Sequence, residues 1–167
     1  MLDSQLEVAR QAKHYLNQID DSEYQEIAKP YLSGSAGMHM RHIIDHYLAL
    51  QRGVELGLVD YNKRNRYSNI EKSTEVAFTE WLKIEQWLTS ICDSDLNAPV
   101  LVISEVSLHK TQTVQVLSSL ARELVFVSSH AIHHFSLLSV MQSIKGKTSP
   151  ENFGVAPATV TFQRAQA

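Results

Sequence analysis

The chain has 167 residues and a mass of 18.9 kDa, so we expect one domain over residues 1–167. Its 15 basic and 18 acidic side chains give a formal net charge of −3, which argues against a general electrostatic attraction to nucleic acid or anionic lipid. The one cysteine, Cys92, excludes an internal disulfide and a paired-cysteine site for zinc or redox chemistry.

Neither a targeting signal nor a membrane-spanning segment is indicated by the sequence. Residues 1–10 carry Asp3 and Glu7 and lack a basic start followed by an apolar block. Apolar runs such as residues 124–127 are far shorter than the ~18 residues that suggest a membrane-spanning helix. We therefore expect a cytoplasmic protein with neither a membrane nor a nucleic acid as a partner.

A first helix is predicted from about residue 4 to residue 19. Ser4 and Glu7 have the spacing of a capping box, which is typical of a helix start. The loop after this helix contains Pro30, which has no amide hydrogen and argues against a continuing helix. Apolar residues recur at helical steps of four, three and four: Val8, Ala12, Tyr15 and Ile19.

The middle of the chain predicts two further helices. The second starts at Ser35 and runs to about residue 56, because Gly57 is a plausible stop signal. A polar connector over residues 60–67 follows. Ser68 and Glu71 then repeat the capping-box spacing, so the third helix is expected to open there. The apolar stripe of the third helix comprises Ala77, Trp81, Ile84, Leu88 and Ile91.

The last part of the chain predicts a hairpin, a helix and a tail. Residues 100–108 and 112–117 are rich in β-branched side chains and flank a polar turn, which indicates a small β-hairpin. The fourth helix opens near residue 118 or 119 and ends near residue 145, before Gly146. Residues 147–167 are expected to form an irregular tail. The predicted fold class is all-α: a four-helix bundle with a small β-hairpin between helices three and four.

Eight histidines are present, and six of them fall in two short windows on different predicted helices. A helical residue advances by about 100 degrees, so His39, His42 and His46 project from one stripe of the second helix. On the fourth helix, His130 and His134 are four residues apart and share a face. Two separate histidine stripes on two amphipathic helices indicate a metal site more strongly than a single pair does.

Metal binding would suit these residue types at this spacing. Two imidazoles one turn apart can bind one ion, and a third from a facing helix can complete the set. Three neutral histidines leave at least one coordination position open, which is typical of a catalytic site. The alternative is a group of hydrogen-bonded core histidines. The HExxH motif of zinc proteases is excluded, because position 131 is alanine where that motif has glutamate. His133 is turned away from His134, and we expect it to be a bystander or a partner of a ligand.

The segments around the histidines carry longer motifs. Residues 34–47 read GSAGMHMRHIIDHY, and residues 122–134 read RELVFVSSHAIHH. The first resembles the second-helix motif of the DinB-like (YfiT-like) superfamily of metal-dependent proteins, and the second resembles its last-helix motif. Residues 60–66 and 153–157 are similar to one branch of that family. The resemblance spans most of the chain and implies an up-down-down-up four-helix bundle with a three-histidine site, usually for zinc or nickel.

The resemblance also implies which residues bind the metal. The ligands fall on His42, His130 and His134, with His42 chosen because an aspartate follows it three places later. His39 and His46 share the stripe of His42 and are its alternatives. A homodimer formed through helix faces is a further expectation from the family.

Three further groups of residues have two interpretations each. Glu123 is expected on the metal-facing side, as a catalytic general base or a partner of a ligand imidazole, or as an acid that only favours the helix start. Asp45 is expected beside the ligands or as a solvated carboxylate. Arg64 and Arg66 would bind an anionic substrate group at the site mouth, or belong to a solvated loop.

The sequence therefore favours a metal-dependent enzyme that acts on a small-molecule substrate with zinc or nickel as its cofactor. Characterised members of the family include thiol-dependent transferases and a thiol-dependent isomerase, which implies that a low-molecular-weight thiol binds as its thiolate. The same open site would alternatively activate water for hydrolysis. The competing class is a non-catalytic metal-binding or protein-interaction module.

Overall fold

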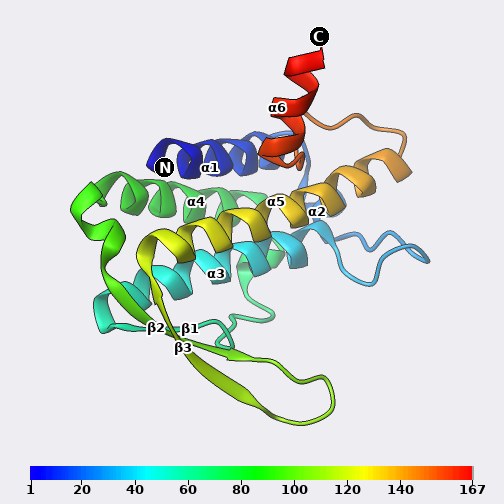
Figure 1. The fold of residues 1–167 in the computed structure, drawn as a ribbon. Helices are drawn as coiled ribbons and strands as arrows, with labels where there is room; N and C mark the ends of the chain where they lie inside the picture. The colour runs from blue at the N-terminus through cyan, green and yellow to red at the C-terminus, as the bar shows by residue number, and fades with distance from the viewer. Residues whose placement is uncertain (167) are drawn as a thin grey trace.

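The computed structural model describes residues 1–166, which form six α-helices and one small sheet (Figure 1). Four of the helices are long. Helices α1 and α3 each pack against both α4 and α5. The predicted mostly helical fold is confirmed, whereas the four-helix bundle arrangement and its up-down-down-up order stay predictions. The four long helices are α1 (Leu2–Leu16), α3 (Ala36–Leu56), α4 (Thr74–Ser90) and α5 (Leu120–Ile144).

Each long helix turns apolar residues into a shared core. The predicted stripe of α4 is buried along the helix, and its Trp81 is fully buried. The Trp81 ring meets Tyr47 of α3 edge to face, with ring centroids 5.3 Å apart. The Trp81 Nε1–H donates to Met40 Sδ at 3.2 Å. Because burying one large apolar side chain contributes roughly 1.5–3 kcal/mol, this stripe stabilises the packing of α4 against α1 and α3.

Three helix ends lie where local signals predict them. The Ser35 hydroxyl caps α3 by accepting from the Met38 amide at 3.2 Å. Gly57 ends the same helix at φ 70, a left-handed conformation that favours glycine. The Ser119 hydroxyl caps α5 by accepting from the Arg122 amide at 3.3 Å.

The first predicted helix is placed differently by the structure. Helix α1 begins at Leu2, and Ser4 lies inside it, where its hydroxyl donates to the Met1 carbonyl at 2.6 Å. The helix ends at Leu16, before residue 19. A short helix that was not predicted, α2 (Asp21–Gln25), follows it because the Asp20 carboxylate caps its first turn.

The third predicted helix starts later than its capping-box spacing suggests. Helix α4 begins at Thr74 and is capped by Ser73, whereas residues Asn69–Glu71 form the 3-10 turn η1. The Glu71 carboxylate does not return to Ser68, because it accepts from Arg41 Nε at 3.3 Å. A contact with a distant part of the chain has replaced the local cap.

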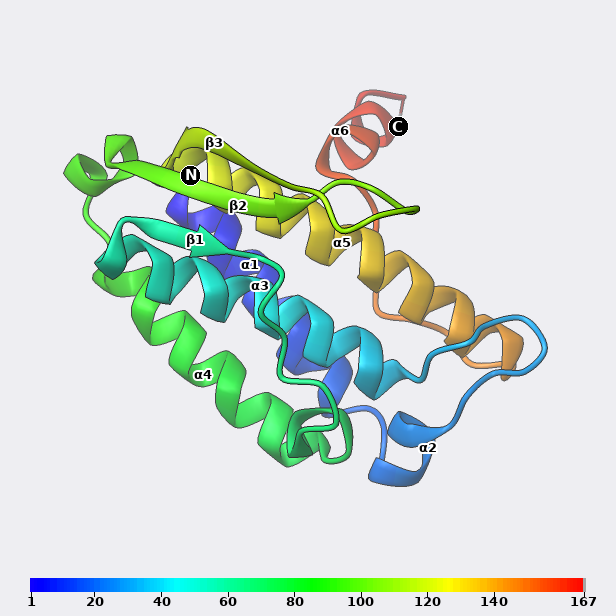
Figure 2. The same ribbon diagram turned by 90° about the horizontal axis from the view of Figure 1, so that it is seen from below.

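The predicted hairpin is confirmed as β2 (Pro99–Glu105) and β3 (Thr113–Ser119), which pair antiparallel after the 3-10 turn η2 (Asp93–Asn97). A third strand, β1 (Leu58–Asp60), pairs parallel with β2 and corrects the hairpin to a sheet of order β1-β2-β3. Three residues are too few to show a strand pattern in sequence. The sheet lies along α3 and α5 (Figure 2).

The irregular tail predicted for residues 147–167 is wrong in part, because Pro157–Gln166 form helix α6. This helix buries none of its side chains and projects from the four long helices on the side away from the sheet (Figure 1). The segment before it is firmly packed. Phe153 is buried and stacks between Tyr15 and Phe135, with ring centroids 5.1 and 4.9 Å away.

Helix α5 is long and apolar enough to cross a membrane when length and composition alone are considered. A core helix of a globular protein can meet the same criteria. Here α5 packs against α1 and α3, and its buried side chains include Leu124, Val127, Phe135 and Leu138.

Candidate metal centre

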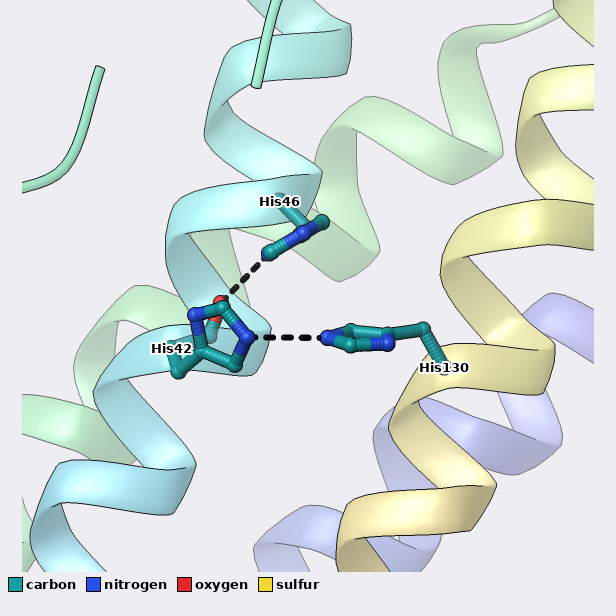
Figure 3. Close-up of side chains that lie close together, drawn as sticks. All are labelled: His42, His46 and His130. Atoms are coloured by element: carbon teal, nitrogen blue, oxygen red, sulfur yellow. Dashed lines mark hydrogen bonds between the residues drawn. The ribbon is translucent and has the colours of Figure 1, made fainter. Parts of the chain in front are cut away.

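Helices α3 and α5 bring the two predicted histidine stripes together, although their residues lie far apart in the chain. Figure 3 shows His42 of α3 pointing across to His130 of α5, with a distance of 3.0 Å between their Nε2 atoms. The His134 Nε2 atom lies 3.2 Å from His130 Nε2. Ligands that share one zinc ion at ~2.0–2.1 Å stand roughly 3.0–3.4 Å apart, so both separations fit a shared cation.

The Nε2 atom of His130 has two ring nitrogens within hydrogen-bond distance, which is more than it can bond in a neutral cluster. A neutral ring nitrogen carries either one hydrogen or one lone pair, so it cannot form two good hydrogen bonds at once. A cation among the nitrogens of His42, His130 and His134 would instead accept one lone pair from each. The arrangement therefore fits a metal ion better than it fits hydrogen bonding alone.

His46 is a further candidate ligand. The ligand atoms of His42, His46 and His130 all lie within 4.8 Å of one another. The His46 Nδ1 atom is 2.8 Å from the His42 carbonyl oxygen, an acceptor, so this nitrogen carries the hydrogen and donates it (Figure 3). The Nε2 lone pair of His46 is therefore free to bind a cation. His42 and His130 belong to both candidate sets, and the third ligand stays a prediction.

The other two histidines lie at the edge of this cluster. The Nδ1 atom of His39 is 2.9 Å from Nδ1 of His134, so His39 can orient that ring. His133 is exposed, and its ring meets His134 edge-on with centroids 5.4 Å apart. His39 contacts Nδ1 of His134, whereas the Nε2 atom of His134 is the one that faces His130. A ligand role for His39 in place of His42 is therefore not favoured.

Burial keeps the cluster uncharged. Burial, and after it the charges of neighbouring imidazoles, lower the pKa of His42 to about 2, that of His134 to about 3 and that of His130 to about 4. Burial also lowers the pKa of His39 and of His46. Neutral imidazoles have lone pairs available, which is the form that binds a metal ion.

Glu123 is buried beside the cluster but does not hydrogen-bond to any described histidine. Its two carboxylate oxygens accept from the Tyr61 hydroxyl at 2.7 Å and from the Ser118 hydroxyl at 2.5 Å. The Tyr61 ring stacks on His46, with centroids 5.3 Å apart and planes 21 degrees from parallel. Glu123 thus reaches the cluster through Tyr61, and its role as a general base stays a prediction.

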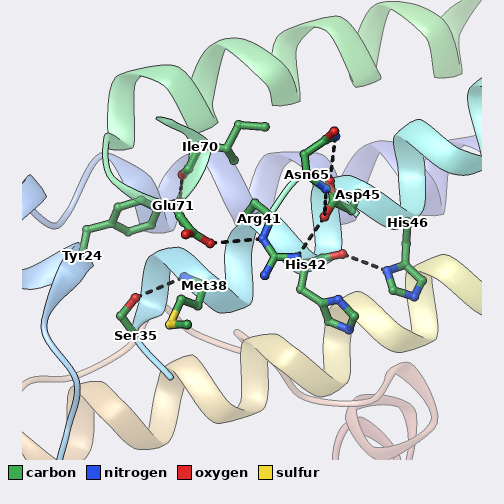
Figure 4. Close-up of polar contacts among 10 residues, drawn as sticks. All are labelled: Tyr24, Ser35, Met38, Arg41, His42, Asp45, His46, Asn65, Ile70 and Glu71. Carbon is green, nitrogen blue, oxygen red and sulfur yellow. Dashed lines mark hydrogen bonds and ion pairs between the residues drawn. The ribbon is translucent and has the colours of Figure 1, made fainter. Parts of the chain in front are cut away.

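Asp45 is not the solvated carboxylate that one interpretation of the sequence expects. It is buried, and it accepts from Arg41 at 2.9 Å and from the backbone and side chain of Asn65 at 3.1 and 3.0 Å (Figure 4). Arg41 also pairs with Glu71. The aspartate of the motif therefore ties the connector after β1 to helix α3, and its oxygens are occupied by these donors.

Arg64 and Arg66 lie on that connector, beside the cluster. Both line a cavity of about 290 Å³ together with His46 and Tyr61. Arg64 also lines a second cavity of about 240 Å³ that reaches the other histidines: His39, His42 and His134. Both side chains are exposed, so this placement agrees with either interpretation of the sequence, and their role in binding a substrate stays a prediction.

Sequence reasoning missed the parts of the site that depend on long-range contacts. It assigned no role to Arg41 or Asn65, and it treated Tyr61 only as part of a polar connector. The Arg41–Asp45 pair at i,i+4 spacing is the one local signal that was available.

These features define a helical protein with a histidine cluster between two of its long helices and polar cavities that reach it. Its fold is similar to that of DinB-like proteins. A DinB-like protein from Bacillus cereus superposes with a TM-score of 0.63 and 18% identity, covering 89% of this chain and 93% of that one. A second, from Bacillus subtilis, gives a TM-score of 0.64 and 17% identity over 91% and 96% of the two chains. The chain thus has the DinB-like fold that the motifs predict.

Comparison at the level of sequence adds one relative. The chain is 28% identical over 109 residues to FK506-binding protein 5 from Rhizopus delemar, which is 65% of this chain and 28% of that protein. The match therefore covers well under half of the longer relative. No family model matches the chain.

Proposed function

We propose that this chain is a metal-dependent enzyme that binds one divalent transition metal between α3 and α5, zinc or nickel by family resemblance. The observation that carries the proposal is the convergence of ring nitrogens on His130, at 3.0 Å from His42 and 3.2 Å from His134. Three protein ligands would leave coordination positions open for a substrate or water, as in catalytic sites.

A metal held there would lower the pKa of a thiol or water molecule bound to it, and so supply a nucleophile at neutral pH. Two groups of residues in the chain would support this chemistry. The half-buried imidazoles hold no charge of their own, so these ligands would leave the positive charge of the cation uncompensated. The pair formed by Tyr61 and Glu123 fixes one wall of the adjoining cavity.

Two reaction classes suit this site. In the first, a small thiol loses its proton, its sulfur forms a bond to an electrophilic carbon, and the leaving group departs with the bonding electrons. In the second, water loses its proton and its oxygen forms a bond to an ester or amide carbonyl carbon. The acyl C–O or C–N bond then breaks, and the leaving alcohol or amine takes up a proton. We favour thiol transfer because the motifs resemble those of the DinB-like superfamily, whose characterised members include thiol-dependent transferases.

A non-catalytic interaction module is the second candidate, and the exposed apolar side chains of the sheet favour it. Leu108 is 98% exposed, Leu117 is 83% exposed and Val116 is 51% exposed. They lie on strand β3 and the loop before it, at an edge of the sheet. Exposed apolar residues at a strand edge are typical of a surface that binds another protein.

Metal content measured by elemental analysis tests the first requirement. Protein purified without a histidine tag should carry about one metal ion per chain, whereas His42→Ala should carry almost none. The control is His109→Ala, which removes an exposed histidine from the hairpin loop. Equal metal content in wild type and His42→Ala would contradict the site.

Activity assays then distinguish a metal-dependent enzyme from a non-catalytic interaction module. Metal-loaded protein is incubated with mercaptoethanol and chlorodinitrobenzene to detect thiol transfer, and with nitrophenyl acetate to detect hydrolysis. We expect turnover of the first mixture that is absent from His42→Ala. A metal-loaded protein that accelerates neither reaction supports the interaction module.

A further inference from the structure

Among the described residues, Arg64 is the one that lines both cavities beside the histidine cluster. One cavity contains His46, and the other contains His42 and His134. Arg64 is also close enough to the cluster for its positive charge to lower the pKa of His42 and of His130. A group bound to the Arg64 guanidinium would therefore lie next to the candidate metal ligands.

Arg64 makes no ion pair in the part of the chain that the structure describes. Arg41 is neutralised by Asp45 and Glu71, and Lys63 pairs with Asp60 at 3.7 Å. Within residues 1–166, no carboxylate lies within ion-pair distance of Arg64 or Arg66, as the full set of ion pairs shows: Lys13–Glu85, Arg41–Asp45, Arg41–Glu71, Lys63–Asp60, Lys83–Glu80, Lys145–Glu23, Lys145–Glu26 and Lys147–Glu23.

The residues around the two arginines leave this charge largely uncompensated. Among residues 1–166, Glu105 is the single acidic residue that lines either cavity. Asp45 lies near enough for its charge to act on Arg64, but it is already paired with Arg41. The histidines are neutral, and a bound cation would add further positive charge. The site as a whole therefore attracts an anion.

The connector is anchored to α3 between these two exposed arginines. Asn65 lies between them, and its backbone and side-chain nitrogens both donate to the buried Asp45 carboxylate, at 3.1 and 3.0 Å. Figure 4 shows this link from Asn65 through Asp45 to Arg41 on α3. A loop that is fixed before the ligand arrives loses less conformational entropy on binding.

We propose that Arg64, assisted by Arg66, binds a carboxylate or phosphate group of the substrate and so places the substrate's reactive atom at the histidine cluster. This inference deepens the proposed function and rests on it. A guanidinium binds either oxyanion through two parallel N–H···O hydrogen bonds. The cavity volumes of about 290 and 240 Å³ suit a small anionic molecule.

Cobalt-loaded protein provides a test that does not depend on turnover, because a thiolate bound to Co²⁺ changes its visible absorption. The probes are mercaptoacetate and mercaptoethanol, which differ in carrying a carboxylate or a hydroxymethyl group. We expect wild type to bind mercaptoacetate about tenfold more tightly. Arg64→Gln should lose this preference and keep its affinity for mercaptoethanol. Lys63→Gln, a change at the neighbouring paired residue, should keep the preference.

The outcomes separate this inference from the proposed function. A preference that persists in Arg64→Gln comes from chelation of cobalt, and a wild type without any preference has no anion site; either result overturns the inference while the metal site stands. If cobalt does not bind, the proposed function fails. Inorganic phosphate is then titrated into the metal-free protein. A shift of the Arg64 side-chain N–H resonance supports the anion site, and an unmoved resonance overturns it.

Discussion

His130 has the central place in the histidine cluster, because its Nε2 atom faces ring nitrogens from both helices. His42 approaches it from α3, and His134 approaches it from the next turn of α5. His46 lies close enough to His42 and His130 to form an alternative set of three. The identity of the third ligand determines which coordination positions stay open and therefore which cavity a substrate enters.

We expect His134 to be the third ligand. Its Nε2 lies 3.2 Å from His130 Nε2, which matches the roughly 3.0–3.4 Å between nitrogens that share a metal ion. His134→Ala should therefore weaken zinc affinity about a hundredfold or more, whereas His46→Ala should weaken it about tenfold, as the loss of a supporting residue does. Competition with a chromogenic zinc chelator measures both affinities.

Two variants calibrate that comparison. His42→Ala removes a ligand common to both sets and should abolish tight binding. His133→Ala removes the exposed neighbour of His134 and should leave the affinity within about twofold of wild type. A larger loss in His46→Ala than in His134→Ala would contradict the assignment and identify His46 as the third ligand.

The metal-free protein should lose stability as the pH falls from about 7 to about 4. The pKa of His42, His134 and His130 is lowered to about 2, 3 and 4 in the folded chain, whereas an unfolded histidine titrates near 6.5. In this window the unfolded chain takes up protons that the folded chain does not, so lower pH favours unfolding. Thermal unfolding followed by circular dichroism should show a Tm that falls by several degrees.

The slope of Tm with pH identifies the groups responsible. His42→Ala removes the histidine with the most strongly lowered pKa, and its Tm should fall less steeply than that of wild type over the same pH range. Identical slopes in the two proteins would show that other groups cause the loss.

At the scale of elements, the parts of the fold that local signals determine were predictable. Ser35 and Ser119 cap their helices with side chains that lie within three residues of the amides they bind. Ser68 has the same signal but caps no α-helix, because Glu71 is paired with Arg41 from another element. Local spacing cannot reveal such a competing partner.

The candidate site shows the same division. The histidine stripes follow from helical periodicity, and the motifs indicate that the two stripes meet. The place of Arg64 does not follow from its neighbours in sequence, because it is set by the hydrogen bonds from Asn65 to Asp45, 20 residues earlier in the chain. The contact of Tyr61 with Glu123 likewise joins residues separated by 62 positions.

The segment before α6 should be an important attachment of the C-terminal region to the core. Phe153 is 3% exposed and lies between the rings of Tyr15 on α1 and Phe135 on α5. Phe153→Ala should lower the free energy of unfolding by about 3–5 kcal/mol, through lost burial and the cavity that remains. Urea denaturation followed by circular dichroism measures the change.

Phe162 is the matched control for this substitution. It lies on α6 and is 65% exposed, so Phe162→Ala should change the free energy of unfolding by less than about 0.5 kcal/mol. Similar losses in both variants would mean that α6 is packed more closely than its exposed side chains indicate.

For the whole molecule, the histidine cluster joins the two halves of the chain. His42 comes from the first half and His130 from the second, separated by 88 positions, and the helices that carry them pack side by side (Figure 2). A cation bound by both residues would therefore form a cross-link that an unfolded chain cannot form. Metal binding and global stability should be thermodynamically linked.

This linkage gives a direct test of the site in the intact protein. Zinc at a free concentration of 100 times its dissociation constant should stabilise the fold by about 2.7 kcal/mol. For a chain of this size, that stabilisation corresponds to a rise in Tm of roughly 5–10 °C. Differential scanning calorimetry should show the rise in wild type and in His109→Ala, where the exposed hairpin histidine is removed. His42→Ala should show almost none, because this substitution removes the α3 ligand that both candidate sets share. An equal rise in His42→Ala would mean that zinc stabilises the protein from a different place.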